Sequence, residues 1–213
     1  MKRILSSGST IEEAVRRVVE KCGLEEGEYE YKVLEKGFKG IFGLFSKEAQ
    51  VEVVINRKYY ERKLKEFIEN ILRLSSIEGK VSTRSNPKTF FATIDTKDVG
   101  KLIGKHGKTL AALQHICTIY LNRMSDTKLN VVLDAGDYRE KRKKQLQAIA
   151  REAIRKVLET KGKVELDPMF PFERRIIHEI VKKSRGVTSY SVGMEPYRRV
   201  VIEYVGREAK TRR

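Results

Sequence analysis

The first 56 residues show a helical and then an alternating hydrophobic pattern. Helical spacing predicts a helix that follows a cap at Ser9 or Thr10 and ends at Gly23, with apolar positions at Ile11, Ala14, Val15, Val18 and Cys22. Apolar residues then alternate with charged ones at 29–33 and at 51–55, as in half-buried strands. We expect a small βαββ-like unit over residues 1–56.

Residues 57–136 give a different order of elements. The pattern predicts a helix over 57–78, strands at about 80–84 and 90–94 with a turn at Ser85-Asn86-Pro87, and a last strand at 129–133. Between these strands, Val99–Leu110 is typical of a helix, a short loop and a second helix that begins at about Lys108. The expected order is therefore αββααβ.

Residues 137–213 follow the turn at Ala135-Gly136-Asp137. The pattern predicts a long helix at about 138–160, another helix that begins after Pro171, and strands at 187–192 and 198–205 with a turn at 193–196. We expect helices packed on a small sheet. The whole chain is thus predicted to be α+β, with three small domains at 1–56, 57–136 and 137–213.

The net charge of +16 rises along the chain. It is +1 over residues 1–60, +4 over 61–137 and +11 over 138–213. Such a basic surface indicates a polyanionic partner, either nucleic acid or an anionic membrane face. No apolar run has the ~20 residues of a membrane span, and the first residues lack the apolar core of a signal peptide, so we expect a cytoplasmic protein.

Two cysteines, Cys22 and Cys117, lie on apolar helical faces, where we expect both to be buried. Their number and spacing indicate neither disulfides nor a metal site, and no cofactor is expected. The sequence offers no paired carboxylates in a pocket-like setting and no nucleophile with a base, so we expect a protein that is not an enzyme.

The loop Gly104-Lys105-His106-Gly107 is the first candidate site. Its glycines leave no Cβ to block a ligand, and the following helix start and the lysines Lys101, Lys105 and Lys108 attract phosphate. Bases are expected beside Ile103. A nucleotide-binding P-loop would need a glycine at position 102, which is Leu102. A glycine-softened connection without a ligand is the other alternative.

Arg174 and His178 form the second candidate site because residues four apart share a helix face. The planar arginine fork can pair with phosphate or stack on a base, and Arg198 and Arg199 could extend the patch. A plain salt-bridge face is the alternative. The basic run 139–144 is typical of a solvated helix face, although a phosphate-facing role is also open.

A glycine-rich apolar segment between the two strands of the first unit is a candidate docking site for a protein. It carries Phe38, Ile41, Phe42 and Phe45. The alternative is a long hairpin loop that folds back over its own sheet, although the apolar content argues against a merely solvated loop.

These motifs resemble known families. The αββααβ order around Gly-x-x-Gly is similar to a type II KH domain, the Arg-x3-His helix resembles the R3H family, and the segment 37–43 resembles the Jag N-terminal domain. Together, in this order, they resemble the SpoIIIJ-associated Jag family, also called KhpB or EloR. That resemblance implies RNA binding, pairing with a small single-KH protein, and a role in cell elongation, division or sporulation. Pairing of the KH unit with a second copy, through its strand edge or its helices, is a separate alternative.

We therefore expect a cytoplasmic binder of single-stranded RNA with two nucleic-acid modules. The KH loop would clamp about four backbone nucleotides. The alternative is a protein–protein adaptor at the membrane face, reached through the N-terminal domain, in which binding of RNA or single-stranded DNA is incidental.

Overall fold

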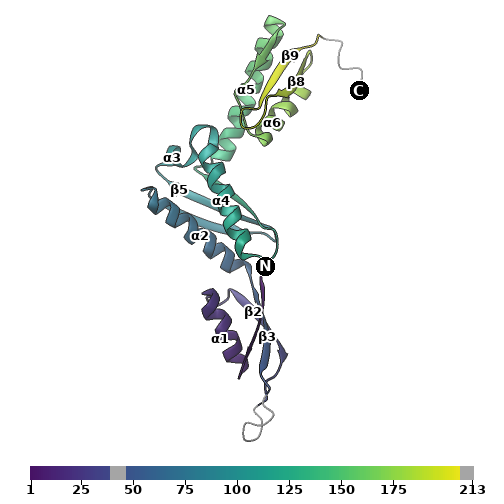
Figure 1. Cartoon of the computed structure of the whole chain (residues 1–213). Coiled ribbons are helices and arrows are strands. Elements are labelled where there is room, and N and C mark those ends of the chain that lie inside the picture. The colour runs from purple at the N-terminus through teal and green to yellow at the C-terminus, as the bar shows by residue number, and fades with distance from the viewer. Residues whose placement is uncertain (39–46, 207–213) are drawn as a thin grey trace. The chain divides into compact units, whose positions relative to one another are not determined.

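The computed structural model describes residues 1–38 and 47–206. It has two compact units, one spanning Met1–Gly136 and one beginning at Asp137. The described residues form three small three-stranded sheets with helices packed on them, which confirms the predicted α+β class (Figure 1). The predicted three-domain division stays a prediction.

The first sheet belongs to a βαββ arrangement, as expected. β1 (Arg3–Gly8), α1 (Ile11–Cys22), β2 (Tyr29–Glu35) and β3 (Ala49–Ile55) follow in order, and the antiparallel sheet has the order β1-β3-β2. Thr10 caps α1 by accepting a hydrogen bond from the Glu13 N–H, and Gly23 ends it in the left-handed conformation. Cys22, predicted to be buried, is only half-buried because it lies in the last turn.

The second sheet confirms the αββααβ order. The elements around this sheet are, in chain order, α2 (Arg57–Leu74), β4 (Gly79–Ser85), β5 (Thr89–Thr96), α3 (Val99–Ile103), a 3-10 turn (Lys105–Gly107), α4 (Lys108–Met124) and β6 (Asn130–Ala135). The strand order is β4-β5-β6, in which β4 pairs antiparallel and β6 parallel to β5. Parallel neighbours need a crossover, and residues 97–129 supply it.

α2 and α4 cover the second sheet and close its core. Their buried side chains meet those of β5 and β6, and these include Leu64, Ile68, Leu113, Cys117, Leu121, Phe90, Ile94, Val131 and Leu133. The predicted end of α2 at residue 78 is wrong. The helix stops at Leu74, since Ser76 has a φ of 52° and cannot continue an α-helix.

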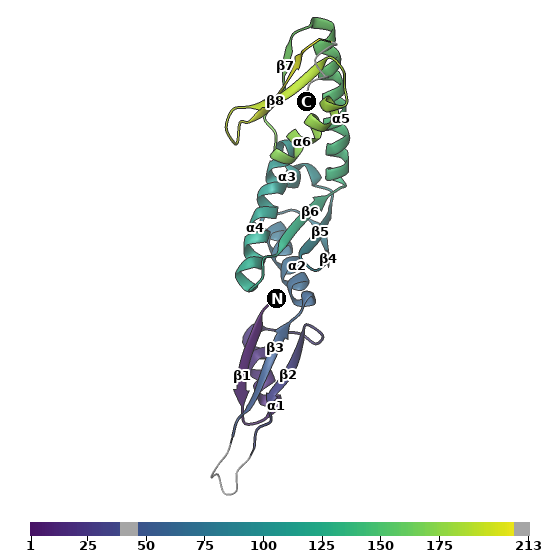
Figure 2. The same ribbon diagram turned by 90° about the vertical axis from the view of Figure 1, so that its right-hand side faces the viewer.

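The second unit is also built on a three-stranded sheet. Its antiparallel sheet has the order β7-β9-β8 and consists of β7 (Lys163–Glu165), β8 (Val187–Val192) and β9 (Arg199–Tyr204). Two helices accompany it, α5 (Tyr138–Thr160) and α6 (Pro171–Lys182) (Figure 2). α5 and α6 pack on one face around a core that includes Leu146, Val157, Ile177, Val200 and Ile202. The sequence did not predict β7, whose three residues are too few to show an alternating pattern.

Candidate nucleic-acid interface

The Gly-x-x-Gly turn lies between two helices, as predicted. α3 ends at Ile103, and the backbone N–H of Gly104 donates to the Gly100 carbonyl at 2.9 Å. The N–H of Gly107 then donates to the Gly104 carbonyl at 3.2 Å, and α4 begins at Lys108 with no side chain capping its N-terminus. The start of α4 therefore presents its helix dipole beside a tight turn.

Gly104 has a structural reason to be glycine that the sequence did not reveal. Its φ of 68° and ψ of −176° belong to a region that glycine alone adopts readily. A Cβ built at this position would lie only 2.1 Å from the Thr109 hydroxyl oxygen. The side of Gly104 that lacks a Cβ thus faces the first turn of α4 and not a ligand, which corrects the sequence-based explanation for this glycine.

The side chains around the turn differ in exposure. Lys105 and Lys108 are exposed, whereas Ile103 and His106 are half-buried. Lys101 lies on α3 with its Nζ 2.9 Å from an Asp98 carboxylate oxygen, so part of its charge is compensated within the protein. The positive charge predicted here is therefore carried mainly by Lys105 and Lys108.

Arg174 does not lie on an open face of α6. Only 9% of its side chain is exposed. Its Nη1 donates to the Met169 carbonyl at 2.8 Å, and its Nη2 is 2.7 Å from Glu195 Oε1. The guanidinium therefore joins the start of α6 to the turn between β8 and β9, so its predicted role as an exposed contact needs correction.

His178 lies one turn beyond Arg174 and bonds to strand β8 through both ring nitrogens. Its Nδ1 is 2.7 Å from the Ser189 hydroxyl, and its Nε2 is 2.9 Å from the Ser191 hydroxyl. Burial, and secondarily the positive charge of Arg174, lower the pKa of His178. The imidazole is thus kept neutral near neutral pH and organises two hydroxyl groups.

A shallow pocket of about 580 Å³ lies where α6 meets β8. Its lining includes His178, Lys182, Ser189, Tyr190, Ser191 and Arg198. The structure thus places His178 and Arg198 on the same pocket, together with Lys182 and the partly exposed Tyr190, which the sequence did not single out. Their signal was weak, because one aromatic residue in a polar strand and one lysine late in a helix are ordinary. Arg199 has its Nη1 3.6 Å from Glu165 Oε2.

The basic run at the start of α5 is not uniformly solvated. Arg142 has only 11% of its side chain exposed, and its Nε donates to Glu173 Oε1 at 2.6 Å. Glu173 is itself buried and accepts a second hydrogen bond from the Phe170 N–H. Lys144, by contrast, is exposed and lies near Glu140.

The candidate docking segment of the first unit can be placed only in part. Phe38 is 60% exposed and forms an isolated bridge with Lys47. Ile41, Phe42 and Phe45 lie outside the described residues.

Residues 1–38 and 47–206 contain neither a metal-ligand cluster nor a membrane-spanning helix. No group of three or more His, Cys, Asp or Glu side chains in that part of the chain could hold a metal ion. None of the helices described there is long and apolar enough to cross a membrane.

Comparisons with known proteins match all three modules. Residues 6–55 match the Jag N-terminus, residues 61–133 match the KH domain of KhpA/KhpB, and residues 144–204 match the R3H domain. These matches fall in the order that the sequence resemblance implied.

Three similar proteins match more than nine-tenths of this chain. A protein from Clostridium symbiosum named RNA-binding protein KhpB is 33% identical, with 95% of this chain and 91% of that protein covered. Its namesake from Bacillus subtilis is 31% identical over 96% of this chain and 99% of its own length. One from Streptococcus pneumoniae is 36% identical over 91% of this chain and 56% of its own length. The chain therefore belongs to the KhpB family.

Proposed function

We propose that this chain binds single-stranded RNA and that the Gly-x-x-Gly turn holds the RNA backbone. The observation that carries the proposal is the turn itself, which opens onto the uncapped start of α4 between exposed Lys105 and Lys108. The N–H groups of Gly104 and Gly107 already donate to carbonyls of the protein, so the flanking lysines and the uncapped first turn of α4 would bind phosphates, and bases would lie beside Ile103. Lys101 and His106 complete the proposed contact surface. The relatives' name, RNA-binding protein KhpB, supports this ligand.

The second unit would supply another RNA contact at the pocket beside β8. Arg198 lines this pocket, and we infer that it contacts phosphates, whereas the predicted contact by Arg199 needs correction, because its guanidinium lies beside Glu165 and outside the pocket. Arg174 and His178 would act by positioning. Arg174 bonds to Met169 and Glu195, and the Met169 N–H in turn donates to the Arg198 carbonyl at 3.2 Å. Two weak contacts on one chain gain affinity from effective concentration, by as much as ~10²–10⁴ where geometry allows.

The cellular role rests on the family resemblance. We infer a non-enzymatic regulator in the cytoplasm, which acts in cell elongation, division or sporulation and pairs with a small single-KH protein or a second copy. A protein–protein adaptor is the second candidate, favoured by the exposed Phe38 at the edge of the predicted docking segment.

Exchange of the loop charges tests the RNA proposal. In the Lys105→Asp/His106→Asp variant, binding of a fluorescent single-stranded RNA should be lost, measured by anisotropy at low salt. Aspartate tolerates the left-handed conformation of residue 106, whose φ is 55°, so the fold should survive. Lys88→Asp, on an exposed turn of the same unit, is the control for a comparable loss of positive charge away from the Gly-x-x-Gly turn.

The salt dependence distinguishes phosphate contacts from an adaptor surface. The log–log slope for the wild type should be about −0.7 per phosphate contact with a single strand. Unchanged RNA affinity in the folded double variant would refute the role of the turn. A DNA oligonucleotide of matched sequence tests whether the 2′-hydroxyl contributes.

A further inference from the structure

One residue joins the first sheet to α2, the first helix of the following KH-like fold. β3 ends at Ile55 and α2 begins at Arg57, so Asn56 alone connects them. The Asn56 side chain caps α2 by accepting from the Lys58 N–H at 2.9 Å, and it donates to the Gly27 carbonyl at 2.7 Å. Its backbone N–H donates to the Glu28 carbonyl. Both the backbone and the side chain of Asn56 are therefore held by hydrogen bonds, so this residue lacks the rotational freedom of a flexible linker.

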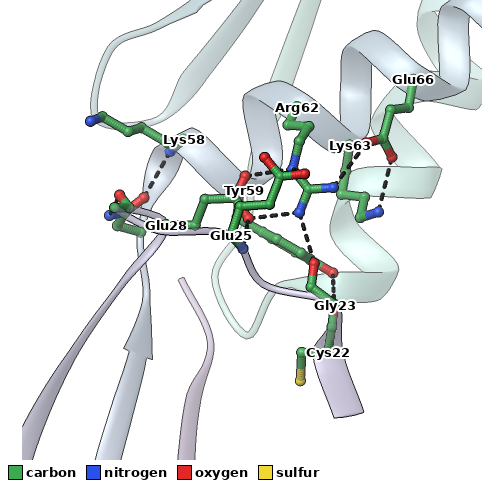
Figure 3. Close-up of polar contacts among 11 residues, drawn as sticks. Cys22, Gly23, Glu25, Glu28, Lys58, Tyr59, Arg62, Lys63 and Glu66 are labelled. Atoms are coloured by element: carbon green, nitrogen blue, oxygen red, sulfur yellow. Dashed lines mark hydrogen bonds and ion pairs between the residues drawn. The ribbon is translucent and has the colours of Figure 1, made fainter. Parts of the chain in front are cut away.

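Arg62 makes a second connection from α2 to the N-terminal fold, which is the βαββ arrangement of residues 1–55. Its Nε and Nη2 bond to the two carboxylate oxygens of Glu28 at 2.6 and 2.7 Å, and Nη2 also donates to the Gly23 carbonyl at 2.8 Å (Figure 3). Nη1 bonds to Glu66 on the next turn of α2, which fixes the guanidinium in place. Such bidentate, charge-assisted bonds define orientation as well as proximity.

The environment strengthens this pair. Glu28 is buried and also accepts a hydrogen bond from the Glu25 N–H. Burial would raise the pKa of the Glu28 carboxyl, but the hydrogen bonds from Arg62 and Glu25 outweigh it and hold that pKa below its ordinary value. The carboxylate is therefore charged at neutral pH and remains paired.

Tyr60 makes a third connection on another side of α2. Tyr60 is fully buried. Its hydroxyl accepts a hydrogen bond from the Lys2 N–H at 3.0 Å and donates one to the Met124 carbonyl at 3.3 Å. Its ring packs edge-on against Phe90 of β5. One side chain thus joins the chain just before β1, the end of α4 and the second sheet.

We propose that residues 1–136 form one rigid body, with the Arg62–Glu28 pair as the pin that fixes the N-terminal fold on α2. All three strands of the first sheet are joined to α2 by a residue next to them in the chain: β1 by Lys2, β2 by Glu28 and β3 by Asn56. A protein that docks on the N-terminal fold would therefore set the orientation of the Gly-x-x-Gly turn directly. The proposal concerns mechanics and does not depend on the ligand of that turn.

Residual dipolar couplings of the weakly aligned full-length chain test this proposal. In the wild type, amides of residues 1–38 and 47–55 should fit the same alignment tensor as those of residues 57–136. In the Glu28→Gln/Arg62→Met variant, the two sets should need separate tensors. Lys65→Met, which removes an exposed pair with Glu69 on the same helix, should keep the single tensor.

The outcomes separate two parts of the idea. Different tensors in the wild type would overturn the rigid body. A single tensor in the folded double variant would overturn the assignment of Arg62 as the pin. If that variant loses the dispersed amide signals of residues 1–55, the wild-type tensor comparison decides.

Discussion

Arg142 and Lys144 lie two residues apart on α5, yet their removal should have very different effects. Arg142→Met takes away the partner of Glu173, whose side chain is only 1% exposed. Removing one member of a buried ion pair typically costs about 3–5 kcal/mol, because the other charge stays buried. Since Glu173 keeps its hydrogen bond from the Phe170 N–H, we expect about 3 kcal/mol, at the low end.

Lys144→Met is the matched control. Its Nζ lies 3.8 Å from a Glu140 oxygen, and 72% of the lysine side chain is exposed. An exposed pair of this kind contributes roughly 0–1 kcal/mol. Both substitutions remove one positive charge from the same helix, so a difference between them reports burial and not net charge.

Native-state hydrogen exchange of the β9 amides in the full chain measures the effect on the second unit alone. A loss of about 3 kcal/mol should reduce protection of Val200–Ile202 roughly 10²-fold, and the control should change it by less than about fivefold. Glu173→Gln added to Arg142→Met should recover part of the loss, since the buried charge is gone. Equal losses for Arg142→Met and Lys144→Met would refute the structural role of the pair.

Two further predictions concern the candidate interface. Gly104→Ala should destabilise the first unit by about 1–3 kcal/mol in chemical unfolding, because its φ and ψ suit glycine and a Cβ would overlap Thr109. Gly100→Ala, whose Cβ would have no atom within 4 Å, should be neutral or stabilising, and equal losses for both glycines would contradict this reasoning. His178, whose pKa is lowered in the folded state, should titrate below pH 6.5 in an NMR titration. Between its folded pKa and 6.5 the unfolded chain binds more protons, so the stability of the second unit should fall as the pH drops below about 6.5; a titration midpoint at or above 6.5 would rule this out.

The sequence predicted most elements because periodicity reports which side of an element is buried. α5 and β8 have the bounds expected from their patterns, and the helix after the Gly-x-x-Gly turn begins at Lys108 as predicted. The misses were local. β7 is too short for a pattern, and α2 stops early because the backbone turns at Ser76, a position where the sequence carries no glycine or proline.

Side-chain environments were harder to predict than elements. Arg142 and Lys144 are equivalent in a charge run, and only the position of Glu173, which lies far along the chain, distinguishes them. Arg174 has the spacing of a surface pair with His178, but Met169 and Glu195 surround it. Spacing along a helix fixes which residues share a face, whereas the identity of what covers that face depends on distant segments.

The parallel pairing of β6 with β5 has a consequence for folding during synthesis on the ribosome. β4 and β5 can pair once Thr96 has left the exit tunnel, but the other edge of β5 has no partner until residues 130–135 have also left it. During that interval a strand bearing Phe90 and Ile94 offers open N–H and carbonyl groups to any neighbouring chain. A nascent chain stalled between these points would be the form of this protein most prone to aggregate.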